Sequence, residues 1–143
     1  MPSTLYTATA TAWGGREGRV ESTDRRVALD LSVPKALGGD DGRGTNPEQL
    51  FAAGYAACFH SALKAAARQE KIDVAESAVS VTVGMVGGLA EGIDLTVRIE
   101  AELPDVPGDR ARNLLEAAHR GCPYSRATQG NVAAELVLVQ TDD

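Results

Sequence analysis

The clearest pattern in the chain is the alternation of apolar and polar residues in IDLTVRIEAEL, residues 93–103. Every second residue is apolar, which predicts a strand with one face on a core and the other in water. Residues 75–86 keep the same period with three valines and Met85, and predict a second long strand. Gly87-Gly88 is expected to end that second strand.

The first third of the chain also has the pattern of strands. Ser3–Trp13 alternates threonine with alanine, and Arg26–Val33 places its apolar residues on one face. Between them, GGREG at residues 14–18 is a turn signal. Residues 35–44, KALGGDDGRG, are rich in glycine and aspartate without any period, and predict a loop.

A long helix is predicted from Asn46-Pro47-Glu48 to about Lys71. Asparagine is a favoured N-cap, proline suits the first helical position, and an acid is stabilised at the positive end of the helix dipole. The first half of this helix is apolar around most of its circumference. It contains residues small enough for another helix to come close, namely Ala52, Ala53, Gly54, Ala56 and Ala57.

A second helix is predicted over Pro107–Arg120. Gly121 is placed as the glycine that follows the helix end. A short helical turn, CPYSRAT, comes next, and Val132–Val139 has the pattern of a last strand. The inner side of the second helix is formed by Ala111, Leu114, Leu115 and Ala118.

Together these elements indicate an α+β fold, and the 143 residues suit a single domain, 1–143. The long helix needs cover on every side, whereas one sheet covers only one side. The chain has no second helix that is equally apolar. A homodimer with two copies of this helix at its centre is therefore expected.

Composition and charge exclude several classes of function. The net charge is −6 and no basic run occurs, which argues against nucleic-acid binding. No apolar run reaches 18 residues and no signal-peptide pattern is present at the N-terminus, so we expect a soluble, cytoplasmic protein that does not bind membranes. Only 4% of the residues are aromatic, so the core must consist mainly of Ala, Val and Leu.

Two cysteines, Cys58 and Cys122, do not form the disulfide framework of a secreted protein, which leaves inert packing or redox chemistry. Burial in the long helix would raise the pKa of Cys58 and leave it inert unless a cation arrives from elsewhere. Cys122 lies before a proline at a helix start, which favours its thiolate. Tyr124 and Ser125 are expected to pack or cap.

A metal site is the alternative use of the two cysteines, since His60 and His119 could complete a set of four ligands. His60 is two residues from Cys58 and therefore points about 200° away from it on a helix. His119 and Cys122 straddle Gly121 without a matching pair elsewhere in the sequence. The spacing therefore disfavours a metal.

The sequence resembles the organic hydroperoxide resistance proteins, a branch of the superfamily that contains the osmotically inducible protein C peroxidases. The resemblance covers nearly the whole chain. It is carried by TNPEQLFAAGYAACF with KALGG before it, by GGREG, and by CPYSRATQGN. It implies antiparallel sheets wrapped around a long buried central helix in an intertwined homodimer. It also implies a two-cysteine peroxidase that uses no metal or prosthetic group.

Matched by position, the resemblance implies that Cys58 is the peroxidatic cysteine and that Cys122 is the resolving one. Cys58 would become a sulfenic acid, which Cys122 would condense into an intramolecular disulfide. Arg16 would supply the cation to Cys58, and Glu48 would hold Arg16 by a bidentate pair. A lipoylated protein or another dithiol would then reopen the disulfide.

Glu48 and Cys58 are ten residues apart, about 15 Å along a helix. If the central helices pack antiparallel in a dimer, Arg16 and Glu48 could serve the Cys58 of the partner chain; we hypothesise such a shared site, and action on their own chain's Cys58 stays open. The substrate is expected to be an organic hydroperoxide with an apolar tail. Two other activities remain open, namely the osmotically inducible protein C type of peroxidase and a sensor that is oxidised without turnover. The candidate pocket walls are Phe51, Tyr55, Phe59 and Met85.

Overall fold

The computed structural model describes residues 2–139. They form two compact units with a boundary between Leu50 and Phe51, called below the N-terminal unit (residues 2–50) and the thiol unit (residues 51–139). The prediction of one domain over the chain stays a prediction. In the described residues no helix combines the length and the apolar character that a membrane span requires.

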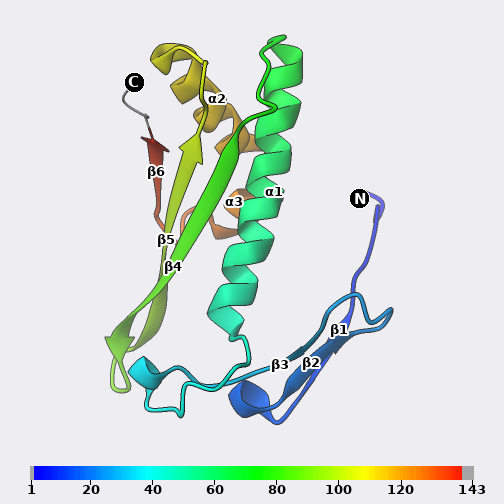
Figure 1. Ribbon diagram of the computed structural model, residues 1–143, viewed down its shortest axis with the longest axis vertical. Coiled ribbons are helices and arrows are strands. Elements are labelled where there is room, and N and C mark those ends of the chain that lie inside the picture. The colour runs from blue at the N-terminus through cyan, green and yellow to red at the C-terminus, as the bar shows by residue number, and fades with distance from the viewer. Residues whose placement is uncertain (1, 140–143) are drawn as a thin grey trace. The chain divides into compact units, whose positions relative to one another are not determined.

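The N-terminal unit is built on a small antiparallel sheet (Figure 1). Its strands, in the order β1-β2-β3, are β1 (Ala10–Trp13), β2 (Arg19–Ser22) and β3 (Ala28–Asp30). The strand predicted over Ser3–Trp13 is thus limited to its last four residues, because β2 pairs only from Ala10↔Ser22 to Trp13↔Arg19. The predicted Arg26–Val33 strand is likewise shorter than expected.

A short 3-10 helix, η1 (Gly15–Glu17), forms the turn between β1 and β2, as the GGREG signal predicts. A second one, η2 (Lys35–Leu37), lies within the predicted loop. Of the apolar residues in this unit only Leu31 is buried. A three-stranded sheet of such short strands has little core of its own.

The long helix, α1 (Pro47–Gln69), begins where the sequence predicts. The Asn46 side chain accepts a hydrogen bond from the Gln49 backbone N–H at 2.8 Å, which confirms the N-cap. The helix ends two residues before Lys71, which has a left-handed φ of 56° that cannot continue a helix. Its buried face repeats every fourth residue, with Tyr55, Phe59, Leu63 and Ala67.

A long antiparallel hairpin follows, made of β4 (Ala78–Gly88) and β5 (Gly92–Glu102). The predicted break at Gly87-Gly88 is wrong, because both glycines stay in the ladder and Gly88 pairs with Gly92. Gly87 adopts a φ of 113°, which the absence of a Cβ allows. The predicted alternation holds at Val97 and Ile99, which are buried, but at the hairpin tip Ile93 is 52% exposed.

The last strand, β6 (Ala134–Val139), pairs with β5 in parallel. This corrects the expectation of purely antiparallel sheets, since the sheet β4-β5-β6 is mixed. The reason lies in the connection, because α2 (Gly108–Gly121) and α3 (Pro123–Thr128) carry the chain back along the sheet before β6 begins. Gly121 is the last helical residue rather than the residue after the helix.

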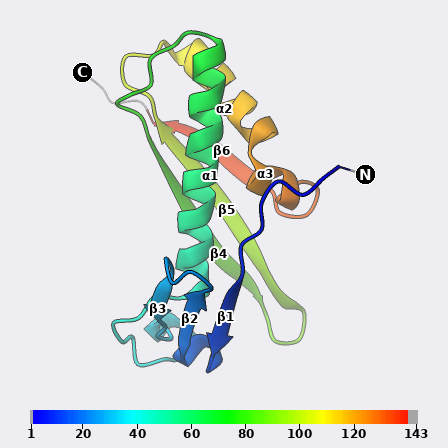
Figure 2. The same cartoon turned by 90° about the vertical axis from the view of Figure 1, so that its right-hand side faces the viewer.

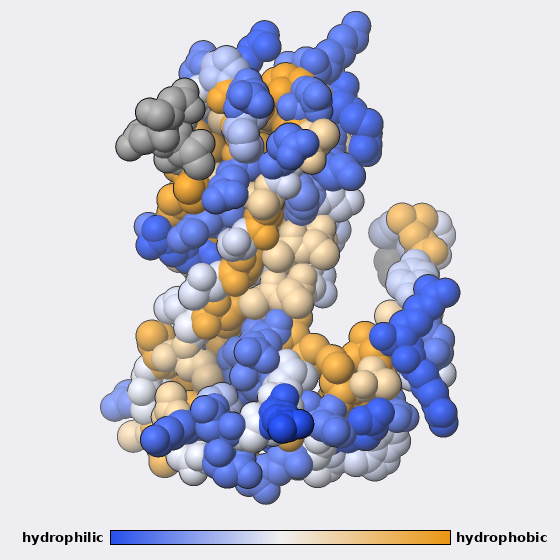
Figure 3. All heavy atoms as spheres, in the orientation of Figure 1, coloured by the Kyte–Doolittle hydropathy of each residue, from blue (hydrophilic) through white to orange (hydrophobic). Residues whose placement is uncertain are grey.

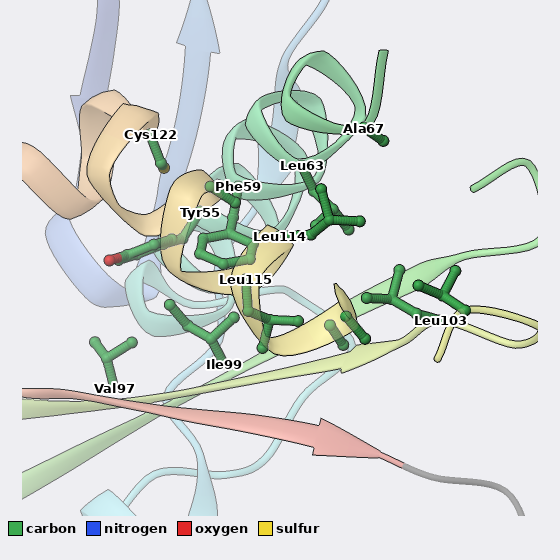
Figure 4. Packing of buried hydrophobic residues seen from close by; sticks show 14 residues of the cluster. Tyr55, Phe59, Leu63, Ala67, Val97, Ile99, Leu103, Leu114, Leu115 and Cys122 are labelled. Atoms are coloured by element: carbon green, nitrogen blue, oxygen red, sulfur yellow. The ribbon is translucent and has the colours of Figure 1, made fainter. Parts of the chain in front are cut away.

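The three helices cover one face of this mixed sheet (Figures 1 and 2). Side chains from β5 point toward those of α1 and α2, and Cys122 lies on the helix side of the same cluster (Figure 4). The predicted inner side of α2 is confirmed by the burial of Ala111, Leu114, Leu115 and Ala118. The core of the thiol unit therefore joins α1, α2 and the sheet.

Candidate active site

The structure brings the two cysteines together. Cys58 lies in the middle of α1 and Cys122 lies between α2 and α3, yet the Cys122 thiol donates to Cys58 Sγ across 3.5 Å. Both are free thiols. A disulfide needs sulfur atoms about 2.05 Å apart, so a small side-chain shift is enough to join them.

Local geometry explains where Cys122 lies. It is the C-cap of α2 and the N-cap of α3, with an extended backbone at φ −73° and ψ 121°. Pro123 favours this geometry in the residue before it and starts α3 at once. The Cys122 side chain is consequently held at a corner between two helices, where it is fully buried.

The Cys58 sulfur lies in a partly buried and mostly apolar place. Its burial raises the pKa of Cys58 above that of an ordinary thiol, and the Cys122 thiol adds to the rise. The backbone N–H of Tyr124 donates toward the sulfur and lowers this pKa in part. Within the chain's own thiol unit, Cys58 is thus biased toward the unreactive thiol form, as its sequence surroundings predict.

Arg16 and Glu48 form the bidentate pair that the resemblance implies. Arg16 Nη1 donates to Glu48 Oε1 at 2.7 Å and Nη2 donates to Oε2 at 2.9 Å. Hydrogen bonding to Arg16 lowers the pKa of Glu48, although partial burial opposes the shift. The same bonds raise the pKa of Arg16, so both groups are charged across the neutral range.

The tight turn around η1 fixes the position of Arg16. A Cβ on Gly18 would lie 1.6 Å from the Trp13 carbonyl oxygen, so only glycine fits there. The turn places Arg16 on η1, and Glu48 in the first turn of α1 meets its guanidinium. Both residues belong to the N-terminal unit.

The four residues proposed as pocket walls lie in different environments. Tyr55 and Phe59 have no exposed surface and belong to the core, while Phe51 and Met85 are half-buried. Phe51 contacts the ring of Tyr124 with ring centroids 6.1 Å apart, and Tyr124 is 39% exposed. Substrate contact by any of the four stays a prediction.

One part of the site was not found from the sequence, where Ser125 was expected only to pack or cap. Ser125 Oγ lies 2.7 Å from Tyr55 Oη and 2.9 Å from His119 Nδ1. The only sequence signal for this contact is spacing, because His119 comes three residues before Cys122 and Ser125 comes three residues after it. Nothing in the sequence indicates that Tyr55, 70 residues away, meets them.

Both histidines bond to serines rather than to cysteines. His60 Nε2 lies 2.9 Å from Ser77 Oγ, and His119 contacts Ser125. Within residues 2–139, no three His, Cys, Asp or Glu residues gather in an arrangement that could hold a metal ion.

Comparison with known proteins places the chain in a family. Residues 38–137 match the model of the OsmC-like protein family. The organic hydroperoxide resistance protein of Xanthomonas axonopodis pv. citri is 47% identical over 135 residues, which are 94% of each chain. Protein OhrA of Bacillus subtilis is 42% identical, over 98% of this chain and all of its own.

Solved structures agree with the sequence comparison. The crystal structure of an organic hydroperoxide resistance protein from Legionella pneumophila has a TM-score of 0.91 and 43% identity, over 96% of this chain and 100% of that chain. OhrB of Bacillus subtilis has a TM-score of 0.86 and 40% identity, over 95% and 100%. The chain therefore belongs to the OsmC-like protein family and, within it, to the organic hydroperoxide resistance proteins.

Proposed function

We propose that this protein is a thiol-dependent peroxidase that reduces organic hydroperoxides and so protects against oxidative stress. The observation that carries the proposal is the 3.5 Å approach of the two free thiols, Cys58 and Cys122, from separate helices. The names of its relatives support resistance to organic hydroperoxides as the biological role. Two adjacent thiols are what a two-cysteine peroxidase requires.

In the first step the Cys58 thiolate attacks one oxygen of the hydroperoxide. The O–O bond breaks, the other oxygen leaves and is protonated to the alcohol, and Cys58 becomes a sulfenic acid. Sulfur is oxidised and the peroxide is reduced. The Tyr124 N–H toward the sulfur supports the thiolate, but the raised pKa of Cys58 indicates that this is not enough.

Arg16 is the cation that we assign to this step. A guanidinium next to the sulfur would favour the thiolate and stabilise the charge that develops on the leaving oxygen. Glu48 holds Arg16 by two hydrogen bonds of 2.7 and 2.9 Å, which orients the guanidinium. Because Glu48 and Cys58 lie about 15 Å apart along one helix, we propose that Arg16 serves the Cys58 of a partner chain.

In the second step the Cys122 thiol attacks the sulfenic acid. The S–O bond breaks, the Cys58–Cys122 disulfide forms, and the hydroxyl group leaves with the thiol proton as water. A dithiol reductant, such as a lipoylated protein, then reduces the disulfide by exchange. Cys58 and Cys122 return to thiols, and the two sulfur atoms of the reductant form a disulfide. No metal or prosthetic group enters this cycle.

A homodimer is part of the proposal. The face of α1 opposite the core exposes small residues, including Ala53, Ala57 and Ser61, and its middle is apolar in colour in Figure 3. The N-terminal unit leaves Trp13 55% exposed and Leu29 40% exposed. A second copy of the chain, with α1 packed on α1 and the N-terminal sheets exchanged, would cover both surfaces.

Light scattering on a sizing column tests the dimer. We expect the wild type to have twice the chain mass of 14.9 kDa, and Ala57→Arg to shift the protein toward single chains. Ala133→Arg, at an exposed loop position, is the matched control and should leave the mass unchanged. A wild-type mass of one chain would contradict the proposal.

Mixed subunits test whether the active site is shared. Cys58→Ser and Arg16→Gln chains, each poorly active alone, are unfolded together and refolded. If Arg16 acts across the dimer, mixed dimers regain one complete site, and about a quarter of the wild-type activity returns. If Arg16 acts within its own chain, the mixture stays as inactive as its components.

The apolar tail of the substrate needs an apolar surface near the sulfur. The partly exposed rings of Phe51 and Tyr124 are candidates because they contact each other and because Tyr124 approaches Cys58 through its backbone. Met85 remains a candidate on β4. Tyr55 and Phe59 would contact substrate only if the core around them opened.

Turnover with a dithiol tests the function itself. We expect the reduced protein to consume many equivalents of cumene hydroperoxide per chain when dihydrolipoamide is supplied, and to react more slowly with hydrogen peroxide. Cys58→Ser should lower turnover by at least about 10³-fold. Cys122→Ser should complete one round of reduction and then stop.

Two outcomes would support other functions. Consumption of one equivalent without further turnover would indicate a sensor that is only oxidised. Equal or faster reduction of hydrogen peroxide would favour the osmotically inducible protein C type of activity. A Cys58→Ser variant with normal turnover would overturn the assignment of both cysteines.

A further inference from the structure

Ser125 in α3 is buried, with 2% of its surface exposed. A buried hydroxyl is costly unless it is hydrogen-bonded. Ser125 Oγ meets Tyr55 Oη at 2.7 Å and His119 Nδ1 at 2.9 Å. One hydroxyl group of α3 therefore connects side chains of α1 and α2.

The direction of the Tyr55–Ser125 hydrogen bond follows from the partners available. Tyr55 has no exposed surface, and Ser125 is the partner of its hydroxyl within residues 2–139, so Tyr55 donates to Ser125. The Ser125 hydroxyl can therefore accept from Tyr55 and also bond to His119 Nδ1.

Each member of this chain of hydrogen bonds lies one helical turn from a reactive thiol. Tyr55 comes three residues before Cys58 on α1, and His119 comes three residues before Cys122 on α2. Ser125 comes three residues after Cys122, in α3. Residues at this spacing share a helix face, so the hydrogen bonds tie together the three segments that carry the thiols.

Figure 4 shows Tyr55 and Cys122 on the same side of the buried cluster, beyond the residues of the sheet. The segment Cys122–Thr128 is short, and α3 has only six residues. Such a short helix is held by its contacts rather than by its own stability. Besides the Cys122–Cys58 contact, the two bonds of Ser125 are the side-chain hydrogen bonds that join this segment to α1 and α2 among the described residues.

We propose that Ser125 is a positioning residue for the second step of the reaction, and that Tyr55 and His119 act with it to hold Cys122 against the oxidised Cys58. The inference rests on the proposed function. In that step the S–O bond of the Cys58 sulfenic acid breaks, the S–S bond to Cys122 forms, and water leaves with the thiol proton. An error of about 1 Å in the position of an attacking atom can cost about 10²-fold in rate.

The test separates the two chemical steps in a single turnover. Reduced protein is mixed with one equivalent of cumene hydroperoxide and quenched at intervals. Peroxide loss reports the first step, while mass spectrometry counts the disulfide and the sulfenic acid trapped by dimedone. For Ser125→Ala we expect a first step within about 2-fold of wild type and disulfide formation at least about 10-fold slower, with trapped sulfenic acid accumulating.

Ser77→Ala is the matched control. Ser77 bonds to His60 of α1 at 2.9 Å in the same way, but this bond does not involve α3. Both steps should keep their wild-type rates in Ser77→Ala. Tyr55→Phe keeps the ring and removes only one bond of Ser125, so its disulfide step should fall between those of wild type and Ser125→Ala.

A double variant tests whether the residues act as a unit. If they do, Tyr55→Phe combined with Ser125→Ala forms the disulfide no more slowly than Ser125→Ala alone. If the slowing of disulfide formation in the two single variants multiplies in the double variant, the residues do not act as a unit. If Ser125→Ala does not fold, the rate of disulfide formation in Tyr55→Phe tests the positioning role by itself. Normal disulfide formation in the variants, or equal slowing of both steps, would overturn the positioning role. A wild type that never forms the disulfide would instead refute the proposed function.

Discussion

The N-terminal unit and the thiol unit differ in how much they bury. In the thiol unit a continuous cluster joins α1, α2 and the sheet, and it includes the Cys122 thiol. In the N-terminal unit Leu31 is the one buried apolar residue, while Trp13 and Leu29 remain largely exposed. The packed cluster of the thiol unit can hold the sulfur atoms of Cys58 and Cys122 at a fixed distance. The N-terminal sheet has little core, and its charged residues Arg16 and Glu48 remain partly exposed to solvent.

The chemistry is divided along the same line. The thiol unit holds both cysteines in surroundings that raise the pKa of Cys58. The N-terminal unit holds the paired charges Arg16 and Glu48, which keep 39% and 20% side-chain exposure. The proposed reaction needs both, because a thiolate in an apolar place requires a cation. Under the proposed function, neither unit is sufficient for the first step.

The two units should differ most in how much stability a substitution removes. Phe59→Ala removes a fully buried ring from the thiol unit, and we expect it to lower the free energy of unfolding by about 3–5 kcal/mol. Leu29→Ala removes a side chain that is 40% exposed, and should cost about 1 kcal/mol or less. Urea denaturation at several protein concentrations measures both, and the values given are for the lowest of them.

Equal losses of unfolding free energy in the two variants at every protein concentration would contradict the difference in packing between the two units. A Leu29→Ala cost that grows with protein concentration would instead place the missing cover of the N-terminal sheet on a second copy. Far-UV circular dichroism at zero urea shows whether Phe59→Ala still folds.

The next largest effect is on the first chemical step. Arg16→Gln keeps a hydrogen-bonding side chain but removes the charge, and we expect it to slow peroxide reduction by about 10–100-fold. Arg19→Gln is the matched control because Arg19 lies in the same unit and also pairs with carboxylates, namely Glu21 and Asp30. Peroxide loss in a single turnover measures the rate of both variants.

An equal loss in Arg16→Gln and Arg19→Gln would show that the net charge of the N-terminal unit matters rather than the position of Arg16. An Arg16→Gln variant with the wild-type rate would remove the N-terminal unit from the chemistry. In that case the Tyr124 N–H would be the main group that favours the Cys58 thiolate.

The sequence predicted the fold well where a local pattern decides the structure. The Asn46 cap, the buried face of α2 and the inner residues of β5 from Val97 onward each depend on neighbours within a few residues, and all three are confirmed. The parallel pairing of β6 was not predicted, because strand direction depends on where α2 and α3 bring the chain. The Gly87-Gly88 signal failed because a strand at a hairpin end tolerates glycine.

The sequence proposes the main members of the site only through the resemblance, and their roles stay predictions. Periodicity places Cys58 on an apolar helix and Cys122 at a helix start, and it cannot show that they lie 3.5 Å apart. The bonds of Ser125 were not predicted, because serine, histidine and tyrosine in unrelated stretches carry no signal of contact. Such contacts depend on the packing of three helices.

The smallest expected effect is the pH dependence of the stability that the Arg16–Glu48 pair contributes. This pair is partly exposed, unlike the buried cluster of the thiol unit. Arg16 lowers the pKa of Glu48, so the folded state favours the charged carboxylate. The stabilisation by Glu48 is therefore complete above the ordinary glutamate pKa of about 4.3 and is lost as the pH falls through the lowered pKa. Both side chains contact solvent, so we expect the pair to contribute about 1 kcal/mol or less to the free energy of unfolding.

The difference in unfolding free energy between wild type and Glu48→Gln should be constant from about pH 6 to 8 and should shrink toward zero in acid. Glu116→Gln, on an exposed position of α2, should show no such trend. A Glu48→Gln difference that grows in acid would mean that the Glu48 carboxylate is destabilised in the fold, and the pair could not then hold Arg16 in place for the reaction.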